Sequence, residues 1–345
     1  MITLVAGLLL VSLVLLGLYL IATRRIAGRE TEAGETLPPG MPGRLILVAG
    51  HRVHIVERGT GPAILLVHGT GGTTLDWETS VFDDLAQDHR VVALDLYGMG
   101  FSDRDDGFAY GFTLWADQLA GTLDALGIER VSVIGQSLGG AIALVFAGKY
   151  PSRVERAVSV DSGPWMPPFM VLMLTPGIGE TILAHSEYWP ERPDQGALYD
   201  ERLRAVYRIR GTRQNLLRAI RGQFFRDGLT YLSAMSRVQC PTLLVHGGAD
   251  DIIPIRAAAS LRRLIKDSEM VVLDGAGHFS MQDSPQRFLQ EVRRFLNAQD
   301  TKRRRDQQRS HQCPSVAERL AAERTRASRE VSIRFTSLMP AVRSG

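Results

Sequence analysis

The sequence has 345 residues, enough for one large domain or two modest ones with an ample apolar core. A hydrophobic fraction of 45% and a charged fraction of 22% exclude both a disordered chain and a membrane protein with many spans. The two cysteines give no disulfide framework and no metal-ligand spacing.

The net charge of +3 is unevenly distributed along the chain. Residues 301–345 contain eleven basic and four acidic side chains, so this segment carries +7 and the remainder carries −4. The main body is therefore not basic, and we expect no nucleic-acid partner.

The chain begins with a long apolar run. Residues 2–22 contain no charge and, at about 1.5 Å per helical residue, match the roughly 30 Å hydrocarbon core of a bilayer. We expect a transmembrane anchor at residues 1–23. A cleaved signal peptide is the alternative, although its basic start and small-residue cleavage site are not evident. Arg24, Arg25 and Arg29 follow the run, so the positive-inside rule places the rest of the chain in the cytoplasm.

Between the two ends, short apolar runs alternate with amphipathic stretches. Eight runs predict strands, at 44–48, 53–57, 63–67, 91–94, 131–134, 157–160, 242–245 and 270–273. The last five are rich in β-branched residues and indicate buried strands, with helical patterns such as 114–125 and 256–265 between them. The fold class is therefore α/β, with a mostly parallel eight-stranded sheet flanked by helices.

These patterns also indicate how the chain is divided. The anchor is followed by a proline- and glycine-rich linker at 24–43 and by core residues at 44–162. A segment at 163–237, with three helical stretches and no strand pattern, predicts a helical cap. Core residues resume at 238–298, and a basic tail at 299–345 is expected to be disordered, with a short helix at 315–327 and contact with anionic lipids as the alternative to solvation.

The clearest chemical motif is Gly135-Gln136-Ser137-Leu138-Gly139. It stands directly after the strand at 131–134 and before a helical run at 141–147, and so tight a turn needs small residues beside a nucleophile. The pattern predicts that Ser137 is exposed at the positive end of a helix.

A serine hydroxyl also needs a base and a residue that orients this base. His278 follows the last strand on a glycine-rich loop and is the candidate base. Asp250 and Asp251 follow the strand at 242–245 and are the candidate acids, with Asp161 at the end of another strand as a third. Adjacent carboxylates point in different directions, so the choice between Asp250 and Asp251 stays open at this stage.

With these motifs, residues 44–295 resemble the α/β-hydrolase superfamily. The resemblance rests on His68-Gly69-Thr70-Gly71-Gly72, Asp95-Leu96-Tyr97-Gly98-Met99-Gly100-Phe101-Ser102, the serine turn, His246-Gly247-Gly248-Ala249-Asp250-Asp251-Ile252-Ile253-Pro254 and Gly277-His278. In such relatives the acid lies four residues before the proline of the penultimate motif, which selects Asp250. The resemblance also implies an oxyanion hole formed by the N–H groups of Thr70 and Leu138, with His68 shaping the loop.

The resemblance implies an enzyme that transfers an acyl group to water. A serine at 137 argues against the epoxide hydrolases and haloalkane dehalogenases of this fold, which use an aspartate there. The anchor and the apolar cap favour a serine hydrolase, esterase- or lipase-like, that cleaves a small lipophilic carboxylic ester through an acyl-enzyme. The alternatives are a carbon–carbon bond hydrolase of dienoate ketones and a non-catalytic ligand-binding protein, although the latter class usually has a broken triad.

Other residues have structural interpretations. The apolar side chains of Trp165, Met166, Phe169, Met170, Leu172 and Met173 are expected to pack the cap onto the core, with an acyl pocket as the alternative. Eight arginines between Asp200 and Asp227 form a solvated helix face or hold an anionic substrate. His51 and His54 lie on opposite faces of a strand and are not expected to bind a metal together. The sequence has no phosphate-cradling loop, so we expect no cofactor.

Overall fold

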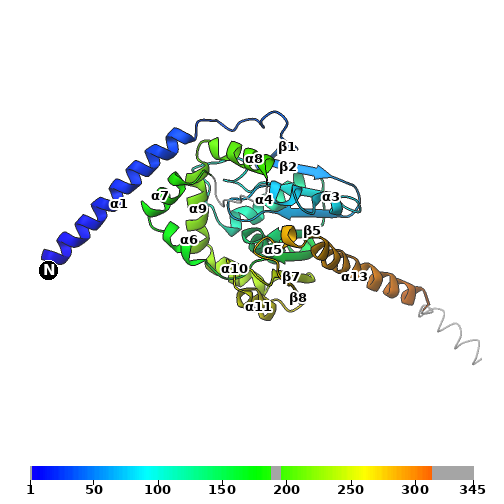
Figure 1. The fold of residues 1–345 in the computed structure, drawn as a ribbon. Coiled ribbons are helices and arrows are strands. Elements are labelled where there is room, and N and C mark those ends of the chain that lie inside the picture. The colour runs from blue at the N-terminus through cyan, green and yellow to red at the C-terminus, as the bar shows by residue number, and fades with distance from the viewer. Residues whose placement is uncertain (1, 188–195, 313–345) are drawn as a thin grey trace, which may run out of the picture. The chain divides into compact units, whose positions relative to one another are not determined.

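The computed structural model describes residues 2–187 and 196–312, and the chain divides into two compact units, Met1–Arg293 and Arg294–Gly345. The first unit contains an eight-stranded sheet flanked by helices, as predicted (Figure 1). Its strands are β1 (Arg44–Val48), β2 (His51–Arg58), β3 (Ala63–Val67), β4 (Arg90–Leu94), β5 (Val131–Gln136), β6 (Val154–Val160), β7 (Thr242–Gly247) and β8 (Ser268–Leu273).

The sheet has the strand order β1-β2-β4-β3-β5-β6-β7-β8. β2 pairs antiparallel with both β1 and β4, and all other neighbours are parallel. From β3 the chain goes first to β4 on one side and then to β5 on the other, so the order reverses between β3 and β5. Ligands of open α/β sheets bind at such a reversal, outside the carboxyl ends of the strands.

The burial of the strands follows from their place in the sheet. β5 and β7 are buried at every residue, because a parallel sheet is covered on both faces. The sequence predicts that the last strand is buried as well, and this prediction is wrong. Only Leu273 of β8 is buried, and Val272 is exposed, because β8 is an edge strand with a neighbour on one side.

Helices connect the strands and place loops at the carboxyl edge of the sheet. The core helices are α2 (Leu75–Glu78), α3 (Phe82–Leu85), α4 (Phe112–Ala125), α5 (Leu138–Lys149), a 3₁₀ turn (Pro151–Arg153), α11 (Ile255–Leu264) and α12 (Ser280–Asp283). Nearly every residue of α5 is buried, because this apolar helix lies between the sheet and neighbouring helices. The position of α5 is thus fixed by packing along most of its length.

The segment between β6 and β7, residues 161–241, is called the insert here. Its described residues contain no strand, as predicted, but five helices rather than three: α6 (Pro168–Met173), α7 (Ile178–His185), α8 (Ala197–Arg208), α9 (Thr212–Phe225) and α10 (Gly228–Met235). Gly177, Gly196 and Gly211 precede α7, α8 and α9 with φ angles of 87°, 86° and 84°. Glycine adopts such angles without steric cost, so the chain can turn at each of these residues as the next helix begins.

The N-terminal apolar run forms helix α1 (Ile2–Arg29). Its residues Leu4–Arg29 form the one helix, in the described part of the chain, that is long and apolar enough to cross a membrane. The predicted linker starts at 24, but the helix continues to Arg29, since residues 24–29 contain no proline and arginine is a good helix former. Glu30 is buried, so the linker is not a free spacer throughout its length.

The disordered tail predicted from residue 299 also starts too early. Helix α13 spans Pro285–Gln312, because no glycine or proline interrupts the sequence between Pro285 and Pro314. The short helix predicted at 315–327 lies outside the described residues.

Candidate active site

Ser137 lies in a sharp turn between β5 and α5. Its φ of 53° and ψ of −115° are unfavourable for a residue with a side chain, at a cost on the order of 1–3 kcal/mol. The turn requires glycine on both sides, because a Cβ at Gly135 would overlap the carbonyl oxygen of Gly139, and a Cβ at Gly139 would overlap that of Val67. The glycine-serine-glycine spacing in the sequence thus has a steric cause.

The structure brings Ser137, His278 and Asp250 into one chain of hydrogen bonds. Nε2 of His278 lies 3.1 Å from Oγ of Ser137, and Nδ1 of His278 lies 2.9 Å from Oδ2 of Asp250. Since a carboxylate accepts hydrogen bonds, Asp250 fixes the tautomer of His278 in which Nδ1 carries the proton. Nε2 then accepts a hydrogen bond from the hydroxyl of Ser137. The three residues come from the loops after β5, β7 and β8, at the same edge of the sheet.

Asp250 is held by more than the histidine. Its Oδ1 accepts hydrogen bonds from the N–H groups of Ile252 and Ile253, each at 2.9 Å, and its side chain is fully buried. Burial raises the pKa of Asp250, but the hydrogen bond and charge of His278 and the two N–H groups outweigh this and hold the pKa below its ordinary value. Asp250 is therefore ionised at neutral pH. The neighbouring Asp251, in contrast to the buried side chain of Asp250, is exposed to solvent.

Asp161, the third candidate acid, does not contact His278. Its two carboxylate oxygens accept hydrogen bonds from the N–H groups of Gly247, at 2.8 Å, and Ser280, at 2.9 Å. Burial raises the pKa of Asp161 well above its ordinary value, in spite of these donors. Asp161 therefore joins the ends of β6 and β7 to the start of α12, which follows the histidine loop.

His246 lies behind the acid. Its Nε2 is 3.0 Å from the carbonyl oxygen of Ile253 and 3.8 Å from Oδ2 of Asp250, and burial lowers its pKa. The donor atoms of Asp161, His246 and Asp250 lie within 4.8 Å of one another, a spacing that could hold a metal ion. The carboxylate oxygens of this group already accept hydrogen bonds from backbone N–H groups or from His278, so the group supports the triad geometry and offers no free set of ligands.

The predicted oxyanion-hole residues lie beside Ser137. Thr70 and Leu138 line the same cavity as the serine, and Leu138 is the first residue of α5, where an N–H group has no acceptor within the helix. A Cβ at Gly69 would lie 3.3 Å from Cβ of Ser137, so the loop after β3 passes close to the nucleophile. Gln136 donates a hydrogen bond of 2.8 Å to the carbonyl oxygen of His278 and thereby links the loops after β5 and β8.

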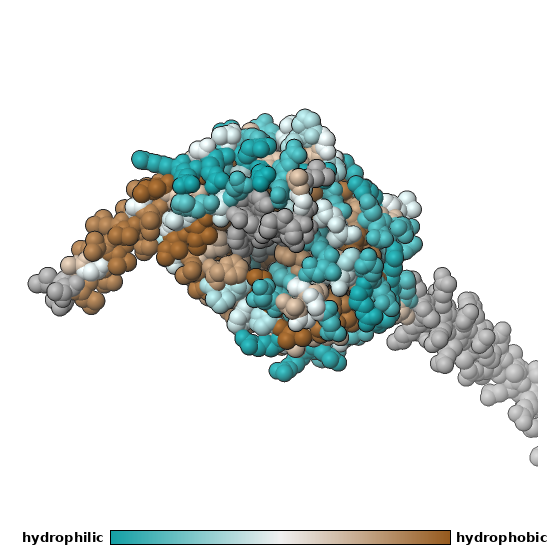
Figure 2. Space-filling model, in the orientation of Figure 1, coloured by the Kyte–Doolittle hydropathy of each residue, from teal (hydrophilic) through white to brown (hydrophobic). Residues whose placement is uncertain are grey.

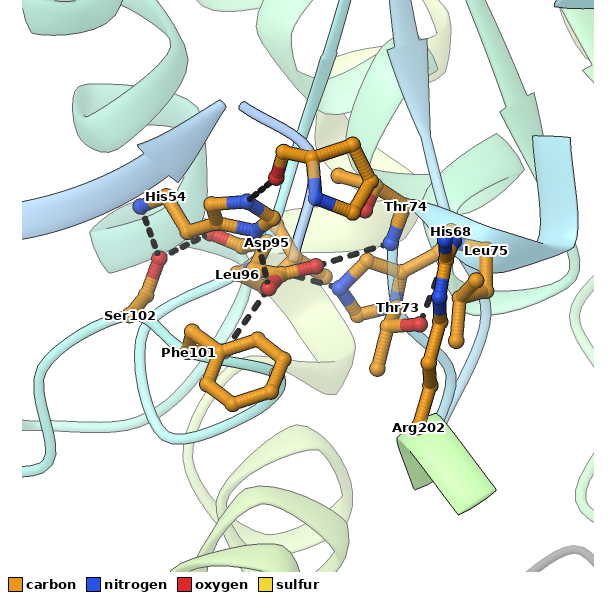
Figure 3. Close-up of polar contacts among 12 residues, drawn as sticks. His54, His68, Thr73, Thr74, Leu75, Asp95, Leu96, Phe101, Ser102 and Arg202 are labelled. Carbon is orange, nitrogen blue, oxygen red and sulfur yellow. Dashed lines mark hydrogen bonds and ion pairs between the residues drawn. The ribbon is translucent and has the colours of Figure 1, made fainter. Parts of the chain in front are cut away.

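A buried network next to the loop after β3 centres on Asp95, which directly follows β4 (Figure 3). Oδ1 of Asp95 accepts a hydrogen bond from the N–H group of Thr74 at 2.8 Å, and Oδ2 accepts one from Phe101 at 2.7 Å. His68 accepts a hydrogen bond from the N–H group of Leu96 at Nε2, so its Nδ1 carries the proton and donates to the carbonyl oxygen of Gly69 at 2.7 Å. The network thus fixes the loop that carries Thr70, the role that the resemblance implies for His68.

His54 completes the network, and the sequence did not indicate this role. Its Nδ1 lies 2.8 Å from Oδ2 of Asp95, and its Nε2 lies 2.9 Å from the carbonyl oxygen of Pro42. Burial lowers the pKa of His54, but the charge and the hydrogen bond of Asp95 raise it by more than burial lowers it. The net shift of the pKa is therefore upward. The pKa of Asp95 is lowered, since His54 outweighs the effect of burial. Each of the two side chains therefore favours the charged form of the other, and only the three-dimensional pairing of β2 with β4 reveals this contact.

A cavity of about 690 Å³ opens beside Ser137, within the size range of ligand pockets. Trp165, Met166, Phe169 and Met170 of the insert line it, as in the alternative that these side chains form a pocket, whereas Met173 packs into the core as expected. Further apolar lining comes from α4, α9 and α10, which carry no recognisable motif: Phe112, Ile220, Phe224, Tyr231 and Leu232. Among the described lining residues there is no lysine or arginine, and the titratable side chains besides His278 and the phenol of Tyr231 are Asp76 and Asp251.

The eight arginines between Asp200 and Asp227 lie elsewhere. Six pair with carboxylates within the described residues, in the pairs Arg202–Glu78, Arg204–Glu187, Arg208–Glu32, Arg213–Glu30, Arg218–Asp106 and Arg221–Glu180. None of the eight lines the cavity. Six of the eight arginines therefore form ion pairs, and none of the eight forms an anion site next to Ser137.

The fold and the site match a known family. The model of the alpha/beta hydrolase family matches residues 64–291. The chain belongs to this family. It is 30% identical over 275 residues to a 2-hydroxy-6-oxo-2,4-heptadienoate hydrolase of Pseudomonas putida strain F1, a match that covers 75% of this chain and 97% of the relative.

Two solved structures share the α/β-hydrolase fold. A meta-cleavage product hydrolase from Pseudomonas fluorescens IP01 is 24% identical, with a TM-score of 0.59, and the match covers 74% of this chain and 98% of the other. A membrane phospholipase A described as a bacterial virulence factor has the same identity and TM-score, with 86% and 99% covered. The chain is an α/β-hydrolase enzyme, so the non-catalytic alternative is not supported. The relatives favour the carbon–carbon bond hydrolase, which the sequence indicates only as an alternative to the ester hydrolase.

Proposed function

We propose that this α/β-hydrolase cleaves an uncharged, lipophilic carboxylic ester through an acyl-enzyme on Ser137. The observation that carries this proposal is the hydrogen-bonded series of Ser137, His278 and Asp250 beside an apolar cavity whose described lining contains no lysine or arginine. Such a cavity suits an acyl chain, because apolar side chains stabilise methylene groups and offer no partner to an anionic group.

The proposed reaction uses these residues in two steps. His278 removes the proton of Ser137 while Oγ attacks the ester carbonyl, and the N–H groups of Thr70 and Leu138 stabilise the negative oxygen that develops. The tetrahedral intermediate collapses as His278 gives the proton to the leaving alcohol. Water, deprotonated by His278, then attacks the acyl carbonyl. The bond to Oγ breaks as His278 returns the proton to Ser137, and the acid is released, while Asp250 keeps the imidazole oriented and stabilises its positive form.

A second candidate is hydrolysis of a carbon–carbon bond in a dienoate ketone. The relative from Pseudomonas putida favours it, since its named activity is of this kind and the match covers nearly its whole length. A dienoate carries a carboxylate, however, and a buried carboxylate needs a charged or hydrogen-bonding partner. The described lining offers it no lysine or arginine, only neutral donors such as the side chains of Gln223 and Tyr231. The relatives thus support this candidate, whereas the chemistry of the cavity supports the ester.

The two candidates are separated by a substrate series. With p-nitrophenyl esters from acetyl to octanoyl, we expect kcat/KM to rise up to about fourfold per methylene until the cavity is full, since each buried methylene contributes about 0.8 kcal/mol. A 2-hydroxy-6-oxo-dienoate, measured by loss of its absorbance, should be turned over poorly. Equal rates for acetyl and octanoyl esters would contradict an acyl pocket, and cleavage of the dienoate with no esterase activity would establish the second candidate.

We also propose that α1 anchors the enzyme in a membrane with the catalytic unit on the cytoplasmic side. Its length and composition support a span, and the basic residues after it, Arg24, Arg25 and Arg29, support this orientation. Of two reporters fused after residue 30, we expect activity from the one that works in the cytoplasm and none from the one that works in the periplasm. Activity of a periplasmic reporter would contradict the orientation, and a soluble product about 25 residues shorter would indicate a cleaved signal peptide.

A further inference from the structure

Helix α1 does not leave the catalytic unit as a free tether, because it packs along α7 of the insert. Ala22 and Ile26 of α1 are buried together with Ala184 of α7. Further toward the N-terminus, a Cβ at Gly177 would lie 2.5 Å from the carbonyl oxygen of Leu15, so the two backbones approach closely there. The start of α7 therefore lies next to Leu15, and the end of α7 lies next to the basic end of α1.

Polar contacts fix the basic end of α1 on the insert. Arg29 donates hydrogen bonds to the carbonyl oxygens of Ala184 and Ser186, at 3.0 and 2.9 Å, where α7 ends. Glu30 accepts hydrogen bonds from the N–H groups of Gly211, at 2.7 Å, and Arg213, at 2.9 Å, and forms a buried ion pair with the side chain of Arg213. Removing one partner of such a pair is strongly destabilising. These contacts therefore hold the C-terminal end of α1 against the insert.

This docking places part of the insert at a definite depth beside the proposed span. Ala22 lies at the end of the uncharged run. Leu15 lies seven residues before it, which is about 10 Å along the helix. If α1 crosses a bilayer, the start of α7 lies at that depth. The insert is suited to it, because residues 162–179 contain no charge, and Glu180, the first acid after them, is 1% exposed and paired with Arg221.

Helix α6, just before this point, exposes an apolar surface. Phe169, Val171 and Leu172 are 41%, 49% and 53% exposed, and hydrophobic surface continues from α1 onto the adjoining insert (Figure 2). Contiguous apolar surface of this kind marks a site of contact with a partner or a membrane. Because it adjoins α1 at the depth of the apolar run, the partner that fits it is lipid.

We propose that α6 and the turn before α7 are inserted into the same leaflet as the C-terminal half of α1. This inference rests on the proposed anchor and adds a second membrane contact to it. Phe169 and Met170 of α6 also line the cavity, so one wall of the cavity faces the lipid and the cavity takes its substrate from the leaflet. A segment that lies in the interface in this way is buried about 5–10 Å into the boundary of headgroups and acyl chains.

The contact is tested with single labelled cysteines in the full-length protein, reconstituted in phosphatidylcholine vesicles. Val171→Cys and Leu172→Cys do not alter the cavity lining, and both are made with Cys313→Ser, while Cys240 is buried. A fluorophore at either position should lose at least about half its emission with lipids that carry a nitroxide in the middle of the acyl chain, which reaches both the boundary region and the centre of the span. Leu10→Cys, within α1, is the positive control, and Leu47→Cys, 68% exposed on the edge strand β1, is the matched negative control.

The outcomes separate this inference from the proposed anchor. Quenching at 10, 171 and 172 but not at 47 supports both. Quenching at 10 alone overturns the insertion of α6 and leaves the span intact. No quenching at 10 overturns the span, and the insertion with it.

A second measurement tests the route of the substrate. The double variant Val171→Asp and Leu172→Asp places charges at the lipid boundary, which is costly. Hydrolysis of a long-chain ester dissolved in the vesicle should fall about tenfold relative to hydrolysis of a water-soluble butyryl ester, whereas Leu47→Asp should leave this ratio unchanged. An unchanged ratio in the double variant, with butyryl hydrolysis intact, would overturn entry from the leaflet.

Discussion

Replacing Ser137 with alanine is expected to lower kcat for an octanoyl ester by about four orders of magnitude or more, because the triad members act as a unit and no other nucleophile takes the place of Oγ. The melting temperature should stay close to that of the wild type, since alanine fits the same turn and the lost hydroxyl contacts only His278 among the described residues. Steady-state kinetics and circular dichroism on the same samples check both statements.

The matched control for this variant is Ser260→Ala. Ser260 lies on α11, and its hydroxyl contacts the carbonyl oxygen of Ala257. This substitution removes the same atom at a residue that does not line the cavity, so kcat should not change. A Ser137→Ala enzyme with wild-type turnover would contradict the proposed reaction altogether.

Replacing Asp250 with asparagine is expected to lower kcat by about 10⁴-fold, because the amide no longer fixes the tautomer of His278 and no longer stabilises its positive form. Asp251→Asn is the control in which the neighbouring carboxylate is changed in the same way. Asp251 is exposed and only lines the cavity, so its kcat should stay within about twofold of the wild type, as for surface substitutions in general.

The comparison of the two variants decides which acid orients the histidine. An inactive Asp251→Asn with an active Asp250→Asn would reverse the assignment. Full activity in both would turn attention to Asp161.

The sequence predicts the sheet well because buried parallel strands have a simple signature. All eight strands are found near the predicted residues, and the serine turn lies where its glycines and the flanking strand and helix require it. The errors arise where a residue's environment is set by tertiary contacts. β8 has the composition of a buried strand but forms an edge, and the residues after Arg24 continue α1 because Arg29 and Glu30 find partners on the insert.

The candidate site divides in the same way. Ser137, His278 and a pair of adjacent acids follow from motifs in chain order, and the resemblance to relatives selects Asp250 from this pair. The structure adds the direction of the side chain, since Asp250 contacts His278. The hydrogen bond of His54 with Asp95 joins residues 41 positions apart, and no local pattern indicates it. The cavity likewise takes Phe112 and Ile220 from helices whose sequences show only ordinary amphipathic packing.

The most direct test of the proposed acyl-enzyme is covalent labelling of the folded enzyme with an alkyl fluorophosphonate, followed by peptide mapping. A serine activated by a histidine reacts with this reagent, whereas ordinary hydroxyls do not. We expect one adduct, on Ser137, which disappears in the Ser137→Ala variant and on prior unfolding. An active enzyme that carries no adduct, or carries it on another residue, would contradict Ser137 as the nucleophile.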